Sequence, residues 1–298
     1  MTVLILEPDV QDDLQHVLSL LPDTSVDAKD DADLKGALDT MPTALLAQIN
    51  PIFETVMQVL RDNAYVQLRG FPLGTDARSI LLIGHALGTV FSDLSHQSAL
   101  VNEAIPSPNA HLQGNQTEPL FLHTDFAMLD QPPACTIVQC VQPDPLGAPF
   151  GENGVAVARH IISKFYGTEK LALVLNTLLP FAGKKPDGSN VVTMRPIMEI
   201  QPDGAPRVCF HPSRIHYGFR LRNEKPLPQE TEALAVFQEM AQQVRLGLQQ
   251  TSGDVLIVNN RAALHDRTLC SLSLSKKGLR ARISRILFLQ DFKEITGW

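Results

Sequence analysis

An imidazole and a carboxylate stand two residues apart in the segment FLHTDF, as His123 and Asp125. In an extended strand, side chains at positions i and i+2 point to the same face. The two groups can therefore occupy adjacent positions on one metal ion, provided that a third ligand comes from elsewhere in the chain. Such a pair also arises by chance, so it predicts a metal site only together with that third ligand.

A later segment, GDVLIVNNRAALHDRT, offers His265 as the third ligand. Gly253 and Asp254 mark a turn, residues 255–258 have the composition of a strand, and His265 follows a short loop. Two histidines and one carboxylate that leave coordination positions open form the facial triad of non-haem Fe(II) oxygenases. Zinc sites more often use three histidines or thiolates, but zinc could occupy the same ligands.

Three arginines follow in the hydrophobic segment GLRARISRILFL, namely Arg280, Arg282 and Arg285. A guanidinium inside a protein is costly unless a carboxylate meets it. A dicarboxylate cosubstrate would supply that partner, because a guanidinium binds a carboxylate through two parallel hydrogen bonds. The alternative is an exposed strand edge on which the arginines are solvated.

The pattern of apolar residues in the first third of the chain predicts helices that support the rest of the fold. Apolar residues recur at helical spacing over residues 10–21 and 45–60, and residues 76–87 predict a further helix. Residues 64–70 predict a strand. We therefore expect residues 1 to about 90 to form a largely helical N-terminal region.

From about residue 95, short apolar runs alternate with Pro, Gly, Asn and Asp. Short strands separated by turns indicate a barrel or a sandwich, and interposed helices make the chain α+β. The segment 181–225, rich in Gly, Pro and charge, predicts either an active-site lid or an ordinary surface insertion. The predicted strands are 135–141, 207–210, 255–259 and 283–289, and the predicted helices are 154–166 and 228–248.

Composition indicates a soluble globular protein and argues against several partners. Of 298 residues, 44% are hydrophobic and 19% are charged, and 25 basic and 32 acidic residues give a net charge of −7. The chain has no basic run, which argues against nucleic acid, and no stretch approaches the ~20 apolar residues of a membrane helix. The N-terminus lacks the pattern of a secretory signal, and four scattered cysteines are typical of reduced thiols in the cytoplasm.

The order of these segments resembles the taurine dioxygenase superfamily, and the context PLFLHTDFAMLDQPPACTIVQCVQPDP is similar to its clavaminate synthase-like branch. The resemblance covers roughly residues 95–290. It implies a single oxygenase domain over residues 1–298, with a double-stranded β-helix (jelly-roll) core and flanking helices. His123, Asp125 and His265 then become ligands of Fe(II). Related halogenases have a small residue in place of Asp125, so this carboxylate favours hydroxylation or desaturation.

The residues that bind the cosubstrate are less regular. The family typically shows Arg-x-x-x-Arg on the last strand, and its first arginine binds the distal carboxylate of 2-oxoglutarate. We expect Arg282 or Arg280 to have this role. Strand alternation places both on the opposite face from Arg285 unless a bulge intervenes, and Arg285 is kept as the other inward-facing candidate, for the substrate. Asn153 stands where the family often has a threonine that contacts 2-oxoglutarate.

The resemblance also implies the reaction. 2-Oxoglutarate and O2 would be converted to succinate and CO2 while an unactivated carbon is hydroxylated. Enzymes of this branch commonly act on free or carrier-tethered amino acids, and Gln113 and Gln116 stand where they contact the amino acid. His211 and Arg214 stand where relatives that act on basic amino acids place aspartates. We therefore expect a neutral or acidic substrate tail, unless Arg214 is simply solvated.

Other activities fit the same residues. The triad could support desaturation, epimerisation or cyclisation in a biosynthetic pathway, and the product mass would separate these from hydroxylation. A catalytically idle protein that binds a small molecule on the same barrel predicts no decarboxylation of 2-oxoglutarate. A zinc-dependent hydrolase predicts activity without O2.

Overall fold

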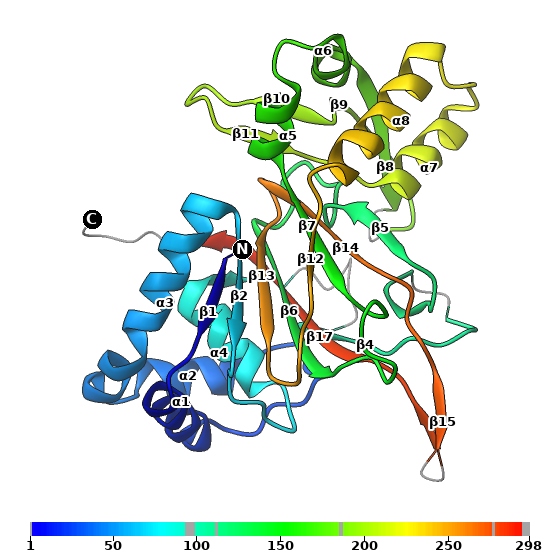
Figure 1. Cartoon of the computed structure of the whole chain (residues 1–298). Coiled ribbons are helices and arrows are strands. Elements are labelled where there is room, and N and C mark those ends of the chain that lie inside the picture. The colour runs from blue at the N-terminus through cyan, green and yellow to red at the C-terminus, as the bar shows by residue number, and fades with distance from the viewer. Residues whose placement is uncertain (1, 93–98, 111–112, 185–186, 276–277, 294–298) are drawn as a thin grey trace.

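A computed structural model of the chain describes residues 2–92, 99–110, 113–184, 187–275 and 278–293. Four N-terminal helices lie together on one side of the molecule (Figure 1). The first and third confirm the helices predicted at 10–21 and 45–60, and buried residues three or four positions apart give each a single apolar stripe. The helices are α1 (Pro8–Leu20), α2 (Ala32–Asp39), α3 (Thr43–Asn63) and α4 (Arg78–Leu87).

A seven-stranded sheet packs against these helices. Its strands pair in the order β1-β2-β13-β6-β17-β3, with β4 also on β17, and only β1 and β2 are parallel. Cys135 and Ile137 of β6 join the helices in one buried cluster. Because side chains alternate along a strand, Thr136 and Val138 point to the opposite face. The strands are β1 (Val3–Ile5), β2 (Tyr65–Arg69), β3 (Gly88–Val90), β4 (Val101–Ala104), β6 (Cys135–Gln142), β13 (Val255–Asn259) and β17 (Ile283–Phe292).

A four-stranded sheet meets that opposite face. Its strands pair in the order β12-β7-β14-β5, all antiparallel. Val138 and Val258 of the first sheet share a buried cluster with Val155 and Ala263 of the second, so the two sheets pack face to face. The strands are β5 (Leu120–His123), β7 (Asn153–Val157), β12 (Leu246–Leu248) and β14 (Ala263–Arg267).

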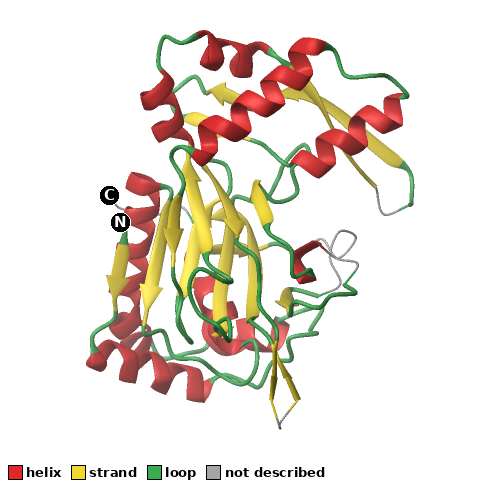
Figure 2. Ribbon diagram, turned by 45° about the vertical axis from the view of Figure 1, so that its right-hand side comes forward, coloured by secondary structure: helices red, strands yellow, loops and turns green. Residues whose placement is uncertain are grey.

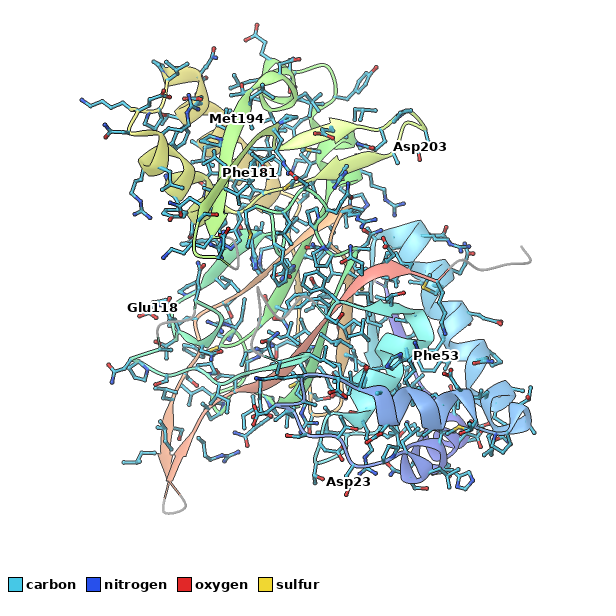
Figure 3. All side chains as sticks on the ribbon, turned by 180° about the vertical axis from the view of Figure 1, so that it is seen from behind. Asp23, Phe53, Glu118, Phe181, Met194 and Asp203 are labelled. Carbon is cyan, nitrogen blue, oxygen red and sulfur yellow. The ribbon has the colours of Figure 1, made fainter. Side chains whose placement is uncertain are left out.

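A lobe of helices and short strands lies beyond one end of the sheets, at the top of Figure 1, and its core includes Leu122, Ala156 and Leu264 of the four-stranded sheet. Its core is separate from that of the N-terminal helices, and Phe181 and Phe53 mark the two cores in Figure 3. A side chain at Gly218 of α7 would collide with the backbone carbonyl of Pro180 in β8, so glycine permits this close approach. The lobe contains α5 (Ala158–Phe165), α6 (Glu169–Asn176), β8 (Leu178–Lys184), β9 (Asn190–Pro196), β10 (Met198–Ile200), β11 (Pro206–Val208), α7 (Pro212–Arg222) and α8 (Pro228–Gln242).

The segment predicted to be a lid or a surface insertion lies within this lobe. The described residues between 181 and 225 include the β8–β9 hairpin and α7, and Phe181, Phe210 and Ile215 are buried in the lobe's core. The short hairpin of β15 (Ser273–Ser275) and β16 (Gly278–Arg280) projects from the sheets (Figure 2). No helix within the described ranges is both long and apolar enough to span a bilayer.

Two of the predicted helices are wrong at one end. The helix predicted over residues 154–166 begins at Ala158, and the one predicted over 228–248 ends at Gln242. Residues 154–157 instead belong to β7 and residues 246–248 form β12, and these two strands pair with each other in the four-stranded sheet. Pairing with a neighbouring strand therefore overrides the helical spacing of the apolar residues.

Candidate metal centre

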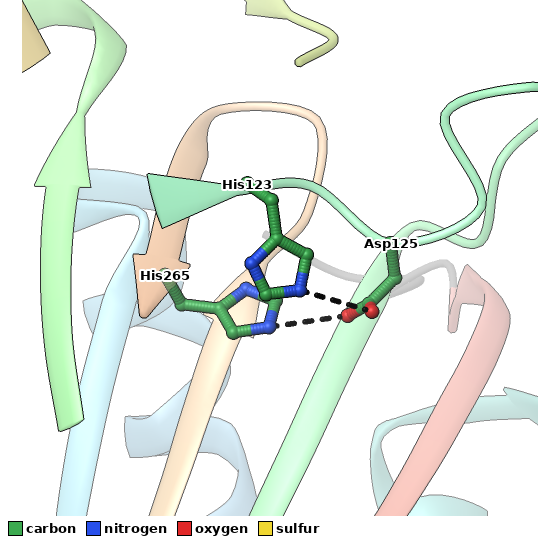
Figure 4. Close-up of side chains that lie close together, drawn as sticks. All are labelled: His123, Asp125 and His265. Carbon is green, nitrogen blue, oxygen red and sulfur yellow. Dashed lines mark ion pairs between the residues drawn. The ribbon is translucent and has the colours of Figure 1, made fainter. Parts of the chain in front are cut away.

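His123, Asp125 and His265 come together at one end of the four-stranded sheet (Figure 4). His123 is the last residue of β5 and is the direct partner of His265 in β14. Asp125 lies in the loop that follows β5. One donor atom from each residue lies within 4.8 Å of the other two. The strand pairing thus explains how two segments 140 residues apart in sequence meet at one point.

Hydrogen bonds from neighbouring residues orient two of the three side chains, those of His123 and Asp125. Nδ1 of His123 lies 2.9 Å from the carbonyl oxygen of Phe121, which leaves Nε2 facing Asp125 at 3.6 Å from Oδ1. The other oxygen of Asp125 accepts a hydrogen bond from the hydroxyl of Thr136 at 2.6 Å and lies 3.3 Å from Nε2 of His265. Partners of this kind fix the direction of metal-binding side chains in proteins.

Burial and charge set the protonation of the three groups. Burial lowers the pKa of His265 to about 4. Burial also lowers the pKa of His123, but the hydrogen bond and charge of Asp125 outweigh it and leave a raised pKa. Burial would raise the pKa of Asp125, yet the neighbouring histidines and the Thr136 hydroxyl lower it overall. An ionised carboxylate beside a neutral imidazole favours a divalent cation, because metal ligands must be deprotonated.

The donor set fits a facial triad. Two imidazole nitrogens and one carboxylate oxygen are available, and the four cysteines are free and buried, with no thiolate in the cluster. Three protein ligands leave further coordination positions open to a chelating cosubstrate and O2.

Arg282 is one of two buried arginines in the C-terminal segment, and the other is Arg285. Arg282 is 4% exposed, and its Nη2 lies 3.3 Å from Oδ1 of Asn153 and 3.5 Å from Oε1 of Gln250. The structure therefore brings together two of the predicted cosubstrate residues, Arg282 and Asn153. The third, Arg280, is exposed on the projecting β15–β16 hairpin.

The expectation that Arg285 faces the site is wrong. Arg285 pairs with Gln139, whose side chain bonds to Ser79 of α4 on the helix-covered face. Its guanidinium donates to three backbone carbonyls of the loop 74–76, at 3.0 Å from Gly74 and 2.9 Å from Thr75. A register shift does occur between Ile283 and Ser284, but it leaves Arg285 on this outer face.

We expect Arg285→Leu to lower the free energy of unfolding by about 2–4 kcal/mol, because it removes the donors of three carbonyls in a partly buried loop. Urea titration of the wild type and the variant would measure this loss. Affinity for 2-oxoglutarate should stay at the wild-type level. If the variant keeps its stability but binds 2-oxoglutarate more weakly, Arg285 contributes to the binding site and our assignment is wrong.

The predicted substrate residues fall into two groups. The His211 ring lies 5.2 Å from that of His123, at the N-terminus of α7. Its Nδ1 is buried without a hydrogen-bond partner among the described residues, and burial lowers the pKa of His211 to about 3. Arg214 is half-buried one turn further along α7. Gln113 is exposed in a 3-10 helix (Gln113–Asn115), and Gln116 donates to the carbonyl of Ala110, so nothing places either beside the triad.

Sequence reasoning missed Arg267, Asn260 and Gln250. Arg267 lies two residues after His265 on the same strand and donates to the carbonyls of Gly114 at 2.7 Å, Gln116 at 2.6 Å and Glu118 at 2.8 Å. The i, i+2 spacing could have found it. Gln250 carries no comparable signal, because its place beside Arg282 depends on packing between sheets.

A family model places the chain among the dioxygenases. The chain belongs to the taurine catabolism dioxygenase TauD/TfdA family, whose model matches residues 36–285. This confirms the prediction of a 2-oxoglutarate-dependent non-haem iron dioxygenase that uses Fe(II), 2-oxoglutarate and O2. A search of curated proteins gives no match.

Solved structures of oxygenases share the fold. An asparagine oxygenase in complex with Fe(II), 2S,3S-3-hydroxyasparagine and succinate is similar with a TM-score of 0.74 at 16% identity, over 98% of this chain and 94% of that one. The non-haem iron oxygenase OrfP, in complex with Fe and α-ketoglutaric acid, gives 0.67 at 15%, over 97% and 94%. PvcB from Pseudomonas aeruginosa gives 0.59 at 20%, over 80% and 79%.

Proposed function

We propose that the chain hydroxylates an unactivated carbon of an amino acid or an amino-acid-derived small molecule, with His123, Asp125 and His265 as the ligands of Fe(II). Substrate, 2-oxoglutarate and O2 would give hydroxylated substrate, succinate and CO2. The observation that carries this proposal is the convergence of the three donors at the four-stranded sheet, whose strand β7 also carries Asn153, the hydrogen-bond partner of the buried Arg282. The packing of the two sheets supports a jelly-roll core.

The solved relatives support an amino-acid substrate. The asparagine oxygenase structure holds a hydroxyasparagine, and one OrfP structure holds (3S)-hydroxy-L-Arg. PvcB is an Fe, α-ketoglutarate dependent oxygenase from an isonitrile synthetic pathway, so an enzyme with this fold serves in a biosynthetic pathway. Desaturation or cyclisation in such a pathway is the alternative use of the same iron chemistry. Asparagine oxygenase aligns over 98% of this chain, which supports one oxygenase domain over its whole length. A cytoplasmic location and a carrier-tethered substrate remain parts of this proposal.

The iron, when bound, supplies the O2 chemistry, and the protein's own residues bind, orient and exclude water. Arg282 would bind the distal carboxylate of 2-oxoglutarate, with Asn153 beside it. The ring of Phe126, the residue after Asp125, meets the ring of Phe288 edge to face, with the centroids 4.9 Å apart. Thr136 holds the Asp125 carboxylate through its hydroxyl hydrogen.

The charge near His211 supports an acidic or neutral substrate tail. Arg214 has a pKa lowered by burial, and no carboxylate in the described ranges forms an ion pair with it. The positive charge of Arg214 contributes, after burial, to the lowered pKa of His211. The ring of His211 in turn packs against the ring of His123. A substrate carboxylate would pair with Arg214 and could accept a hydrogen bond from the unpartnered His211 ring.

The class of the enzyme is tested by anaerobic titration with Fe(II) and 2-oxoglutarate. A weak visible charge-transfer band that shifts when a candidate amino acid is added would support the proposal. Absence of the band, and of succinate release with every amino acid tried, would favour the catalytically idle binding protein. The product mass then separates hydroxylation, which adds one oxygen, from desaturation, which removes two hydrogens.

We expect Arg214→Gln to lower kcat/KM for an acidic amino acid such as glutamate by roughly 10- to 100-fold, the range of a lost charged hydrogen bond. Coupled succinate release over a panel of amino acids would measure the change. Arg220→Gln is the matched control, because Arg220 is exposed on the same helix and lies over Tyr217. Equal turnover of arginine and glutamate by the wild type would contradict the acidic tail.

A further inference from the structure

Asn260 is a buried amide in the turn between β13 and β14, five residues before His265. It is 2% exposed. Its Oδ1 accepts a hydrogen bond from the backbone N–H of Asp125 at 2.8 Å, and its Nδ2 donates to the carbonyl of Asp125 at 3.1 Å. The same Nδ2 donates to the carbonyl of Pro133 at 2.9 Å. The side chain therefore binds both backbone polar groups of Asp125.

Asp125 needs such a partner because it lies outside the sheet. β5 ends at His123, so no strand of the ladder pairs with the backbone of Asp125. The next residue, Phe126, has a φ of +52°, in the left-handed region that a bulky side chain adopts at a cost of about 1–3 kcal/mol. A backbone that turns in this way stays in place only when surrounding contacts determine it.

We propose that Asn260 is a positioning residue for the metal: it fixes the backbone of Asp125 so that the carboxylate meets the two histidines before a metal ion binds. Thr136 fixes the carboxylate itself, so backbone and side chain of this ligand are held separately. Because Asn260 and His265 belong to one short turn and strand, a single segment places two of the three donors. This inference rests on the proposed triad.

The chemistry of the amide is what the site requires. One planar group accepts at Oδ1 and donates twice at Nδ2, whereas the shorter serine hydroxyl has a single hydrogen and can donate to only one of the two carbonyls. Alanine would leave one N–H and two carbonyls without partners in a buried place. We therefore expect a graded loss of metal affinity, from asparagine through serine to alanine.

The test is Co(II) binding to the full-length apoprotein, followed by titration calorimetry and by the visible d–d bands of Co(II). Asn260→Ala is expected to weaken Co(II) binding by about 10- to 100-fold, the range for partners that orient metal ligands. Its Co(II) spectrum should differ from that of the wild type, because the carboxylate is no longer held in place. Asn260→Ser should lie between the two, and it carries the test if the alanine variant does not fold.

The matched control is the neighbouring Asn259, whose Oδ1 accepts from the backbone N–H of Arg261 at 3.0 Å and from no other donor of the described residues. Asn259→Ala should leave the affinity and the spectrum of Co(II) unchanged, even if it lowers the melting temperature. Wild-type affinity and spectrum in both Asn260 variants would overturn the proposal. If Asp125→Ala also binds Co(II) as the wild type does, the triad itself is wrong, and the two failures are thereby distinguished.

Discussion

Asp125→Ala is expected to abolish succinate formation and to weaken Fe(II) binding by about 1000-fold or more, which corresponds to about 4 kcal/mol. The variant keeps both imidazoles but loses the charged donor of a cluster whose atoms lie within 4.8 Å of one another. Neutral imidazoles alone neither neutralise the cation nor complete the face of the coordination sphere. Anaerobic Fe(II) titration and succinate release measure the two effects.

Asp130→Ala is the control for this result, because Asp130 is a carboxylate of the same loop whose side chain is 87% exposed. It should bind iron and form succinate as the wild type does. Full iron-dependent succinate formation by Asp125→Ala would show that the metal is bound elsewhere. Turnover without O2 and without 2-oxoglutarate would instead favour the zinc-dependent hydrolase.

The cluster could be predicted from sequence because two of its residues, His123 and Asp125, are close in sequence, and the third, His265, follows a recognisable strand. His123 and Asp125 are separated by one residue, and the strand before His265 was clear from its β-branched residues. That strand, β13, has the predicted bounds, and β6 and β17 begin at the predicted residues. Long apolar periodicity likewise made α1 and α3 predictable.

The direction of the arginines could not be settled from sequence. Alternation along an extended segment predicts that Arg282 and Arg285 face opposite ways, but not which of the two sheet faces is the inner one. The answer depends on the pairing of Arg285 with Gln139 and on the helix that covers that face. Arg280 faces neither side of the large sheet, because it lies on the projecting β15–β16 hairpin.

Long-range contacts explain the remaining omissions. Asn260 stands 135 residues from Asp125, and nothing in the motif around it indicates which backbone it binds. The helix predicted over residues 154–166 failed for a related reason, because Val155 and Val157 are buried in a sheet core that only the fold creates. The sequence therefore predicted the cluster of His123, Asp125 and His265 better than the residues that hold this cluster in place.

Arg282→Leu is expected to weaken 2-oxoglutarate binding by about 100- to 1000-fold, or about 3–4 kcal/mol, while Co(II) affinity stays unchanged. Arg282 is 4% exposed, and its hydrogen-bond partners Asn153 and Gln250 are neutral amides. No carboxylate of the described residues forms an ion pair with it, and Asp144 nearby already accepts from Ser271. A dicarboxylate cosubstrate would supply the missing anion, and a titration followed by the charge-transfer band measures its affinity.

Arg280→Leu is the control that decides between the two candidate arginines, because Arg280 is exposed and two residues away. It should bind 2-oxoglutarate normally, and the reverse pattern would transfer the role to Arg280. The stabilities of the Arg282→Leu and Arg285→Leu variants provide an independent test of the two roles. Removing a buried cation that lacks an anionic partner is neutral or stabilising for the protein without cosubstrate, whereas Arg285→Leu breaks three satisfied hydrogen bonds. We therefore expect urea titrations to separate the two buried arginines, with a loss of stability in Arg285→Leu and no loss in Arg282→Leu.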